Sequence, residues 1–312
     1  MTSSGAAARG SACADCDTAS CATKTRRRDE SDAEFAERQQ LESRLCRIRH
    51  TLLVLSGKGG VGKSTVSVNL AVSLVRAGLR VGLLDIDIHG PSIPTMLGLD
   101  GAAPCAGAGA VLPVERAGLK VMSIGFFLSN RDDAVIWRGP MKMGVIKQFL
   151  KDVEWGDLDC LIIDSPPGTG DEPLSVCQLV AHADGAVVVT TPQRVATADV
   201  RRSITFCRKL GLPVLGVVEN MSGFVCPQCG ATTAIFQRGG GERMAGELNV
   251  PFLGGIPMDP RVVEASDAGT PCVECVSDSP VGRAFDQIGR SILDLLRTSS
   301  RRLPHAMPGD SA

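Results

Sequence analysis

The sequence lacks an excess of charge of either sign. Its 33 lysine and arginine residues are balanced by 34 aspartate and glutamate residues, which gives a formal net charge of -1. A protein that binds polyanions without specificity needs a positive field at its surface. The balance therefore argues against nucleic acid or an anionic membrane as a partner, and we expect neither.

Long hydrophobic runs are absent as well. No apolar stretch approaches the roughly 18 residues that a membrane-spanning helix requires. The N-terminal stretch MTSSGAAARGSACADC contains no apolar core of signal-peptide length. We therefore expect no membrane span and no secretion, and hence a protein of the reducing cytoplasm.

Cysteine, by contrast, is abundant: the chain has 12, although disulfides do not persist in such a compartment. Cys160, Cys177 and Cys207 lie in apolar or periodic segments, where a cysteine is typically a small buried hydrophobe. A second group lies in stretches rich in glycine, proline, serine or aspartate, and most of its members form Cys-x-x-Cys pairs typical of metal ligands. This group consists of Cys13, Cys16, Cys21, Cys226, Cys229, Cys272 and Cys275.

Strand-like apolar runs alternate with segments long enough for helical crossovers from about residue 50 onward. The runs are TLLVLS, RVGLLDID, KVMSIG, DCLIID, GAVVVTT, PVLGVVEN and FLGGIP. Continuous Val, Leu and Ile runs are typical of strands that are buried on both faces. They predict a doubly wound α/β fold, with a mostly parallel sheet flanked by helices.

The chain divides into four segments by composition. We expect a flexible cysteine-containing arm at residues 1–28, a charged helical lead-in at 29–49, the α/β domain at 50–299 and a frayed tail at 300–312. The arm carries no hydrophobic period, whereas the lead-in spaces its few apolar residues along one helical face.

The strongest chemical signal is GKGGVGKST at residues 57–65, between a strand-like run and a helical pattern. This is the context of a phosphate-binding P-loop, whose glycines let backbone N–H groups turn toward phosphate oxygens at a helix N-terminus. Lys63 is expected to neutralise the β- and γ-phosphates, and the Ser64 hydroxyl to ligate Mg²⁺. The predicted nucleotide-binding residues of the loop are Gly57, Lys58, Gly59, Gly60, Val61, Gly62, Lys63, Ser64 and Thr65.

Three aspartates stand where predicted strands end. Asp85 ends one hydrophobic run, Asp87 falls just beyond it, and Asp164 ends the run DCLIID. Parallel sheets bind ligands at the carboxyl ends of their strands, so Asp164 is expected to hold Mg²⁺ as a Walker B aspartate does. The turn-rich SPPGTGDE that follows it predicts a loop that senses the γ-phosphate. An aspartate that only caps the next helix is the structural alternative.

The pair Cys226 and Cys229 lies in ENMSGFVCPQCG, where flanking proline and glycine turn two thiolates toward one metal. Two ligands do not complete a tetrahedral site, so a second copy of the chain must supply the rest. The spacing alone does not separate zinc from an iron-sulfur cluster.

The loop at residues 57–65 resembles the deviant Walker A motif of the MinD/ParA/nitrogenase-iron-protein class, because it carries Lys58 as an additional lysine. The resemblance implies a nucleotide-sandwich homodimer in which Lys58 reaches the partner's nucleotide and stabilises charge there. It also makes Asp87 the candidate for positioning the attacking water and places Asp85 near the metal. The expected catalytic residues are thus Lys58, Lys63 and Asp87, and the expected magnesium ligands are Ser64, Asp85 and Asp164.

Five stretches together closely resemble the Mrp/ApbC-type iron-sulfur cluster carrier ATPases of that class. They are LSGKGGVGKS, DIDIHGPSIPTMLG, WRGPMK, IIDSPPGTGDE and ENMSGFVCPQCG. The resemblance implies ATP, Mg²⁺ and a labile 4Fe-4S cluster, which bridges two copies of the chain through Cys226 and Cys229 of each. It further implies slow ATP hydrolysis, a contact between Asn220 and adenine, a cluster donor, and apo iron-sulfur proteins as clients.

The N-terminal CADCDTASC resembles the cysteine-rich arm of some members of this family, in which four cysteines hold a second cluster. Here Cys13, Cys16 and Cys21 are present, with no cysteine upstream of them. Three thiolates cannot close a four-ligand cage, and Cys46, a candidate for the fourth, is better explained as structural. A cluster, a zinc knuckle and a simple exchange site therefore stay open for the arm. Metal ligation, redox activity and inertness stay open for the pair in GTPCVECVSDSP, at residues 272–275.

Two further functions compete with a cluster carrier. A spatial-organising ATPase of the MinD or ParA kind would dock on a membrane or on DNA, but the C-terminal RRLPHAMPGDSA is no amphipathic basic helix. Such a protein also has no need of the CPQC pair. A zinc-stabilised NTPase differs from a cluster carrier only in its metal. The sequence therefore favours the carrier.

Overall fold

The computed structural model describes residues 26, 30–88, 90–107, 109–128, 139–180, 183–226 and 228–299. The expected arm lies outside the described residues except for residue 26, and the expected tail lies outside them entirely. The prediction of a second metal site at Cys13, Cys16 and Cys21 therefore falls on residues that are not described.

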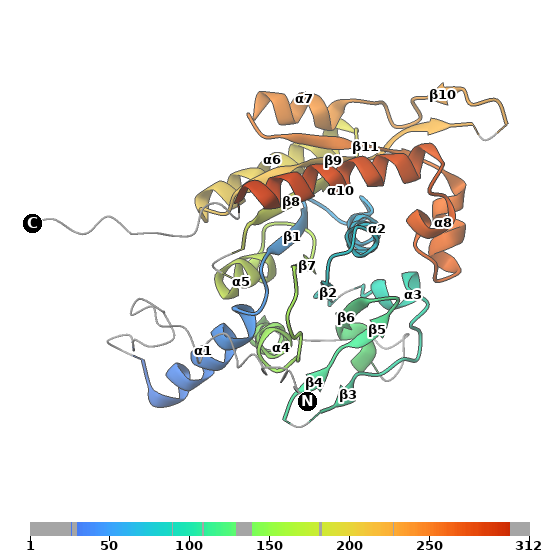
Figure 1. Cartoon of the computed structure of the whole chain (residues 1–312). Helices are drawn as coiled ribbons and strands as arrows, with labels where there is room; N and C mark the ends of the chain where they lie inside the picture. The colour runs from blue at the N-terminus through green and yellow to red at the C-terminus, as the bar shows by residue number, and fades with distance from the viewer. Residues whose placement is uncertain are drawn as a thin grey trace, which may run out of the picture.

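A single mixed sheet forms the centre of the molecule. Its parallel strands are β1 (Thr51–Ser56), β2 (Val81–Asp85), β6 (Leu119–Ser123), β7 (Cys160–Asp164), β8 (Gly185–Thr190), β9 (Val214–Val225) and β11 (Phe252–Met258). Two short antiparallel strands flank them, β5 (Val114–Arg116) and β10 (Thr232–Thr233). The order is β10-β9-β8-β1-β7-β2-β6-β5, with β11 also paired to β9 (Figure 1). The predicted mostly parallel α/β sheet is confirmed.

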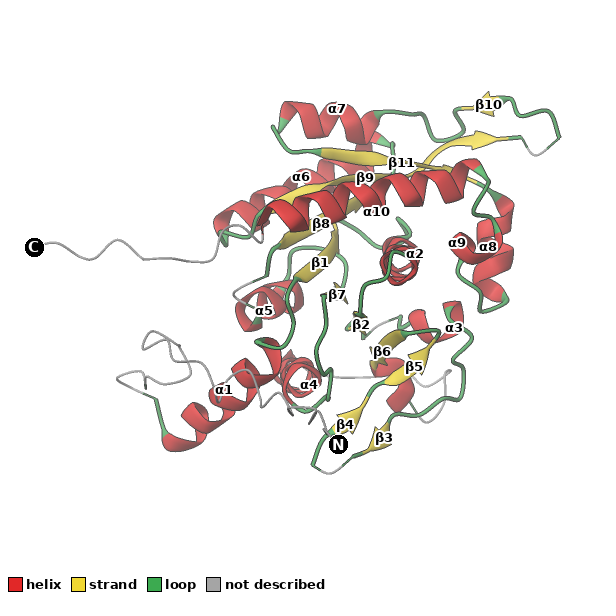
Figure 2. Cartoon of the chain, in the orientation of Figure 1, coloured by secondary structure: helices red, strands yellow, loops and turns green. Residues whose placement is uncertain are grey.

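Helices cover both faces of this sheet (Figure 2). One face packs against α2 (Lys63–Arg76), α3 (Ile93–Met96), α8 (Pro260–Asp267), α9 (Cys272–Cys275) and α10 (Pro280–Ser299). The other packs against α1 (Asp32–Leu45), η1 (Ile124–Phe127), α4 (Gly139–Lys151), α5 (Asp171–Leu179), α6 (Arg194–Lys209) and α7 (Gly240–Glu247). None of the described helices is both long enough and apolar enough to cross a membrane.

The strand sequences explain why the sheet is covered on both sides. In β1, Leu52 and Val54 join the core beneath α2, whereas Leu53 and Leu55 join the core on the opposite face. Because successive side chains of a strand point to opposite faces, a continuous apolar run must be buried twice. A small two-stranded sheet, β3 (Cys105–Ala106) with β4 (Val111–Leu112), is separate from the main sheet, and Val111 packs against the core on the second face.

Helix α1 lies inside the range 29–49 and attaches to the body through apolar packing of Leu41 and Leu45 and through ion pairs. Leu41 is its one buried residue. Glu37 forms ion pairs with Lys147 and Lys151 of α4. The helix is therefore a surface element that contributes Leu41 to the core.

The three cysteines that were expected in the core are largely there. Cys160 and Cys207 are fully buried, and Cys177 is half-buried. Burial raises the pKa of the Cys177 thiol to about 11 and that of the Cys207 thiol to about 12. These thiols are neutral and packed, as small hydrophobes are.

Candidate functional site

The P-loop joins the end of β1 to the start of α2, and its shape requires glycine. Gly60 and Gly62 adopt φ angles of 77° and 80°, in the left-handed region that favours glycine. A Cβ on Gly57 would lie 2.5 Å from the backbone carbon of Asp199, and one on Gly62 would lie 2.2 Å from Nδ2 of Asn220. The loop leads directly into the N-terminus of α2, where backbone N–H groups and the helix dipole stabilise an anion.

Lys63 and Ser64, at the start of α2, meet Asp164 at the end of β7. Nζ of Lys63 lies 2.7 Å from Oδ2 of Asp164, and Oγ of Ser64 donates to the same oxygen at 2.6 Å. Lys63 is 6% exposed and Asp164 is 0% exposed. The lysine that is expected to face phosphate is thus paired, inside the protein, with the carboxylate that is expected to face the metal.

Two further carboxylates stand beside this pair. Asp85 is opposite Asp164 in the register of β2 and β7, and Oδ2 of Asp87 lies 3.6 Å from Nζ of Lys63. Burial, together with the charge of Asp164, raises the pKa of Asp85 to about 7. Oxygen donors and an excess of negative charge in one place are what a hard cation such as Mg²⁺ requires, so the residues fit the expected ion.

Two hydroxyl groups of the site were not predicted from the sequence. Oγ of Ser67 donates to Oδ1 of Asp164 at 2.6 Å, and Oγ of Ser123 donates to Oδ2 of Asp85 at 2.8 Å. Ser67 follows Lys63 by one helical turn, so the helix period could have placed it on the same side of α2. Ser123 ends β6, and no local signal shows that β6 lies next to β2.

The rest of the nucleotide site surrounds the loop. The backbone N–H of Gly168, in the segment SPPGTGDE, donates to the carbonyl of Ser56 at 2.8 Å and brings that segment beside the P-loop. Nδ2 of Asn220 donates to the carbonyl of Val61 at 2.9 Å, which brings β9 against the loop from another side. Lys58 is half-buried, and no carboxylate of the described residues forms an ion pair with it.

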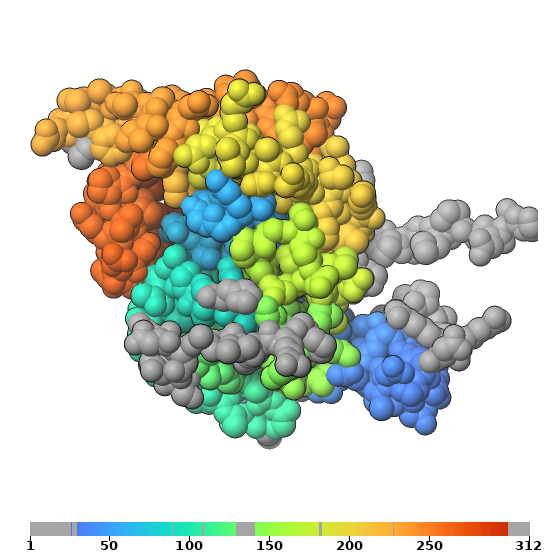
Figure 3. All heavy atoms as spheres, turned by 180° about the vertical axis from the view of Figure 1, so that it is seen from behind, coloured from blue at the N-terminus to red at the C-terminus, as the bar shows by residue number. Residues whose placement is uncertain are grey.

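Cys226 and Cys229 lie in the turn between β9 and β10, in a hairpin that projects from the body (Figures 1 and 3). Two backbone hydrogen bonds close the turn, from Cys226 N to Ala231 O at 2.9 Å and from Gly230 N to Cys226 O at 2.8 Å. The backbone N–H groups of Cys229 and Gln228 and the thiol of Cys229 hold the pKa of Cys226 below its ordinary value. An accessible thiol that ionises easily, next to a second one, suits a soft metal.

Among the residues that the structure describes, the hairpin offers a metal its two thiols alone. No third His, Cys, Asp or Glu side chain of the described residues joins Cys226 and Cys229 in a group that could hold a metal ion. The ligands beyond the two thiols must therefore come from residues outside the described ones, from another chain or from a small molecule.

The pair Cys272 and Cys275 has a different environment. The thiol of Cys272 is buried and donates to Oδ1 of Asn69 at 3.1 Å. Burial and the neighbouring Cys275 raise the pKa of Cys272 to about 12. Cys275 is exposed, so the two thiols are not presented together at the surface. Cys46 is exposed at the end of α1, where its thiol donates to the carbonyl of Ser43 at 3.2 Å.

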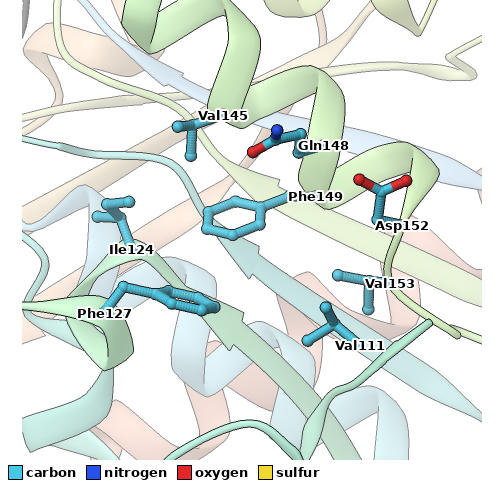
Figure 4. A pocket seen from close by; sticks show the side chains of 8 residues that line it. All are labelled: Val111, Ile124, Phe127, Val145, Gln148, Phe149, Asp152 and Val153. Atoms are coloured by element: carbon cyan, nitrogen blue, oxygen red, sulfur yellow. The ribbon is translucent and has the colours of Figure 1, made fainter. Parts of the chain in front are cut away.

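An apolar pocket of about 230 Å³ lies between β4, η1 and α4 (Figure 4). The rings of Phe127 and Phe149 stack in it, with their centroids 5.6 Å apart. Its lining is formed by Val111, Ile124, Phe127, Val145, Gln148, Phe149, Asp152 and Val153. None of the predicted nucleotide or metal residues is among them.

Comparisons with known proteins identify the family of this chain. The sequence profile of the family described as NUBPL iron-transfer P-loop NTPase matches residues 47–293. The chain is 48% identical to an iron-sulfur cluster carrier protein of Methanocaldococcus jannaschii over 280 residues, which cover 89% of this chain and 95% of that protein. It is 51% identical to the cytosolic Fe-S cluster assembly factor NUBP2 of Bos taurus over 254 residues, or 80% of this chain and 94% of that protein.

Solved structures show the same fold. A nucleotide-binding protein from Archaeoglobus fulgidus in complex with ADP has a TM-score of 0.67 and 42% identity, over 74% of this chain and 91% of that one. The cell division protein MinD of Aquifex aeolicus has a TM-score of 0.56 at 20% identity, over 84% of this chain and 100% of that one. At 20% identity, the match to MinD shows a shared fold alone.

Proposed function

The chain belongs to the NUBPL iron-transfer P-loop NTPase family, and on that basis we propose that it is an ATP-hydrolysing carrier of a labile 4Fe-4S cluster. The cluster is its cargo, held between two copies of the chain by Cys226 and Cys229 of each and passed to apo iron-sulfur proteins. The observation that carries the proposal is the presence, in one chain, of a P-loop site and a pair of cysteines in a projecting hairpin, one half-buried and one exposed, linked by β9.

The nucleotide site supports slow hydrolysis of ATP. Lys63 binds the β- and γ-phosphates once it leaves Asp164, and Ser64, Asp85 and Asp164 hold Mg²⁺, which neutralises phosphate charge when bound. Asp87, which is less buried than Asp85 and Asp164, positions the attacking water. The complex of the Archaeoglobus fulgidus protein with ADP supports nucleotide binding by this chain.

Lys58 and Asn220 complete the nucleotide site. Lys58 acts in the partner's nucleotide site, a role that fits its lack of an ion pair among the described residues. Asn220 contacts the adenine base, a role that its hydrogen bond to the loop supports. Both roles require that two copies face each other across the nucleotides.

The number of thiolates that a 4Fe-4S cluster requires also supports a dimer. A 4Fe-4S cluster takes four thiolates, and each chain offers two of them in the hairpin. One cluster per two chains satisfies both numbers. The cluster donor and the clients bind transiently, and a second site at Cys13, Cys16 and Cys21 remains part of the proposal. Some relatives are named cytosolic, which supports the cytoplasm as the location of this chain.

The experiment that tests this function is anaerobic reconstitution of the full-length chain with Cys13, Cys16 and Cys21 changed to serine. Iron, sulfide and zinc contents and oligomeric state are then measured. We expect about four irons per two chains, broad absorbance near roughly 400 nm and transfer to an apo-acceptor.

The matched controls separate the hairpin from other cysteines. Adding Cys226→Ser and Cys229→Ser should remove the iron and leave ATP binding intact. Adding Cys46→Ser and Cys105→Ser, which change two exposed thiols outside the hairpin, should remove none. Undiminished iron after the first pair of changes would refute the cluster site, and zinc without iron or sulfide would favour a zinc-stabilised NTPase.

A further inference from the structure

Strand β9 carries residues of both sites and bends between them. Asn220 contacts the P-loop, and Cys226 follows the last residue of the strand. Between these positions Met221 and Gly223 adopt φ angles of 57° and 79°. The left-handed conformation is sterically unfavourable for a residue with a Cβ, so other contacts must hold Met221 in the bend.

Glu219 supplies such contacts. Its carboxylate is fully buried, and Oε1 accepts hydrogen bonds from Oγ of Ser222 at 2.6 Å and from N of Gly239 at 2.8 Å. Oε2 accepts a third, from N of Gly241, at 2.6 Å. Ser222 and Gly239 stand immediately before and after residues 223–238, which contain the hairpin. A single carboxylate oxygen therefore joins the two ends of the hairpin at its base.

The chemistry of this contact specifies a carboxylate. All three groups around Glu219 donate hydrogen bonds, and an ionised carboxylate accepts on both oxygens, whereas an amide must present N–H on one side. Gly239 and Gly241 lie at the N-terminus of α7, where the helix dipole also favours negative charge. A Cβ on Gly241 would lie 3.1 Å from Oε2, so glycine allows this close approach.

Glu219 and Asn220 are neighbours in β9, and they tie the strand to opposite sides. Successive side chains of a strand point to opposite faces. One side chain reaches the P-loop through Val61, and the other reaches the start of α7. Movement of the strand at one contact is therefore resisted or transmitted at the other.

We propose that Glu219 is a positioning residue that fixes the cysteine-bearing hairpin relative to Asn220, so that nucleotide binding changes the reactivity and metal affinity of Cys226 and Cys229. The inference rests on the proposed function, because it takes these thiols as the cluster ligands. By thermodynamic linkage, a metal at the thiols must change nucleotide affinity by the same factor.

The test measures thiol reactivity in the metal-free, full-length chain. The rates of alkylation of Cys226 and Cys229 are followed by peptide mass spectrometry, with and without Mg²⁺ and ADP. Cys46 and Cys105 are exposed and lie outside the hairpin, so they serve as internal references. In the natural chain we expect nucleotide to change the rates at the hairpin by about fivefold or more, and to leave the references unchanged.

Glu219→Gln should abolish this response while ADP still binds. Glu242→Gln is the matched control, because it makes the same chemical change at an exposed position in the first turn of α7, and it should respond as the natural chain does. Ser222→Ala keeps the carboxylate and removes one of its three donors, so it should weaken the response. Ser222→Ala decides the question if Glu219→Gln does not fold.

The inference would be overturned if nucleotide left the alkylation rates of the natural chain unchanged. It would also be overturned by a full response in Glu219→Gln. If Glu219→Gln does not fold, a full response in Ser222→Ala would overturn it instead. Failure of the proposed function is distinguishable, because it shows as a lack of iron after reconstitution, and the alkylation assay needs no metal. A chain that retains the cluster but has unresponsive thiols would refute the role of Glu219 alone.

Discussion

Lys63→Met should destabilise the protein even without nucleotide, although the residue is expected to serve nucleotide binding. Lys63 and Asp164 form a buried ion pair at 2.7 Å. Removing one partner of such a pair typically costs about 3–5 kcal/mol, because a charge stays buried without compensation. The hydroxyls of Ser64 and Ser67 still donate to Asp164, so we expect the lower end, about 3 kcal/mol.

The double variant isolates the interaction. Lys63→Met with Asp164→Asn removes both charges, so its free energy of unfolding should lie within about 1 kcal/mol of that of the natural chain. Each single change leaves one buried charge without its partner, so the coupling energy of the cycle should be at least about 2 kcal/mol. Urea denaturation near neutral pH in the presence of a chelator measures all four proteins.

The control is Lys209→Met, which removes an exposed lysine near the end of α6 and should change stability by no more than about 0.5 kcal/mol. Additive effects of the two single changes, with no coupling energy, would refute the reasoning. They would mean that the lysine and the carboxylate do not meet in the folded protein when nucleotide is absent.

Four further outcomes are expected. Asp87→Ala should bind ATP but lose turnover; unchanged turnover in a steady-state assay contradicts its role. Inactive Lys58→Ala chains mixed with inactive Asp87→Ala chains should regain some ATPase activity, since a mixed dimer holds one intact composite site; verified mixed dimers without activity argue against action in trans. Asp85→Asn should become more stable relative to the natural chain as pH rises from about 5 to 8 in chelator, because ionising a carboxyl whose pKa is raised to about 7 costs folding energy; parallel stability profiles would contradict this. Cys272→Ser keeps a donor to Asn69 and should leave the iron content unchanged; a loss of iron would indicate that Cys272 and Cys275 are metal ligands.

Much of the fold and of the nucleotide site could be predicted because their signals are local. A continuous apolar run such as that of β1 identifies a strand buried on both faces, and the glycines of the P-loop lie within a few residues of Lys63. The parallel order then brings the carboxyl ends of β2 and β7 together, so Asp85 and Asp164 could be assigned to one site before their contact was known.

The remaining features depend on contacts between distant segments. Ser123 reaches Asp85 only because β6 pairs with β2, and Glu219 reaches Gly239 only because the hairpin returns to its base. Cys272 shares the spacing of a ligand pair, yet α9 packs against α2 and buries its thiol. A two-cysteine spacing is therefore weak evidence of a metal site until exposure is known.

The charges of the nucleotide site explain why it can be both buried and functional. Asp85 and Asp164 are almost completely buried, and Lys63 forms ion pairs with Asp87 and Asp164. Burying like charges together is costly, and the raised pKa of Asp85 shows that the protein relieves part of this cost by binding a proton. A divalent cation would replace that proton and satisfy the same oxygens, so stability lost in the empty site is regained on binding. An apolar core of the same volume would be more stable, but it would lack the charge that a Mg²⁺-nucleotide complex needs.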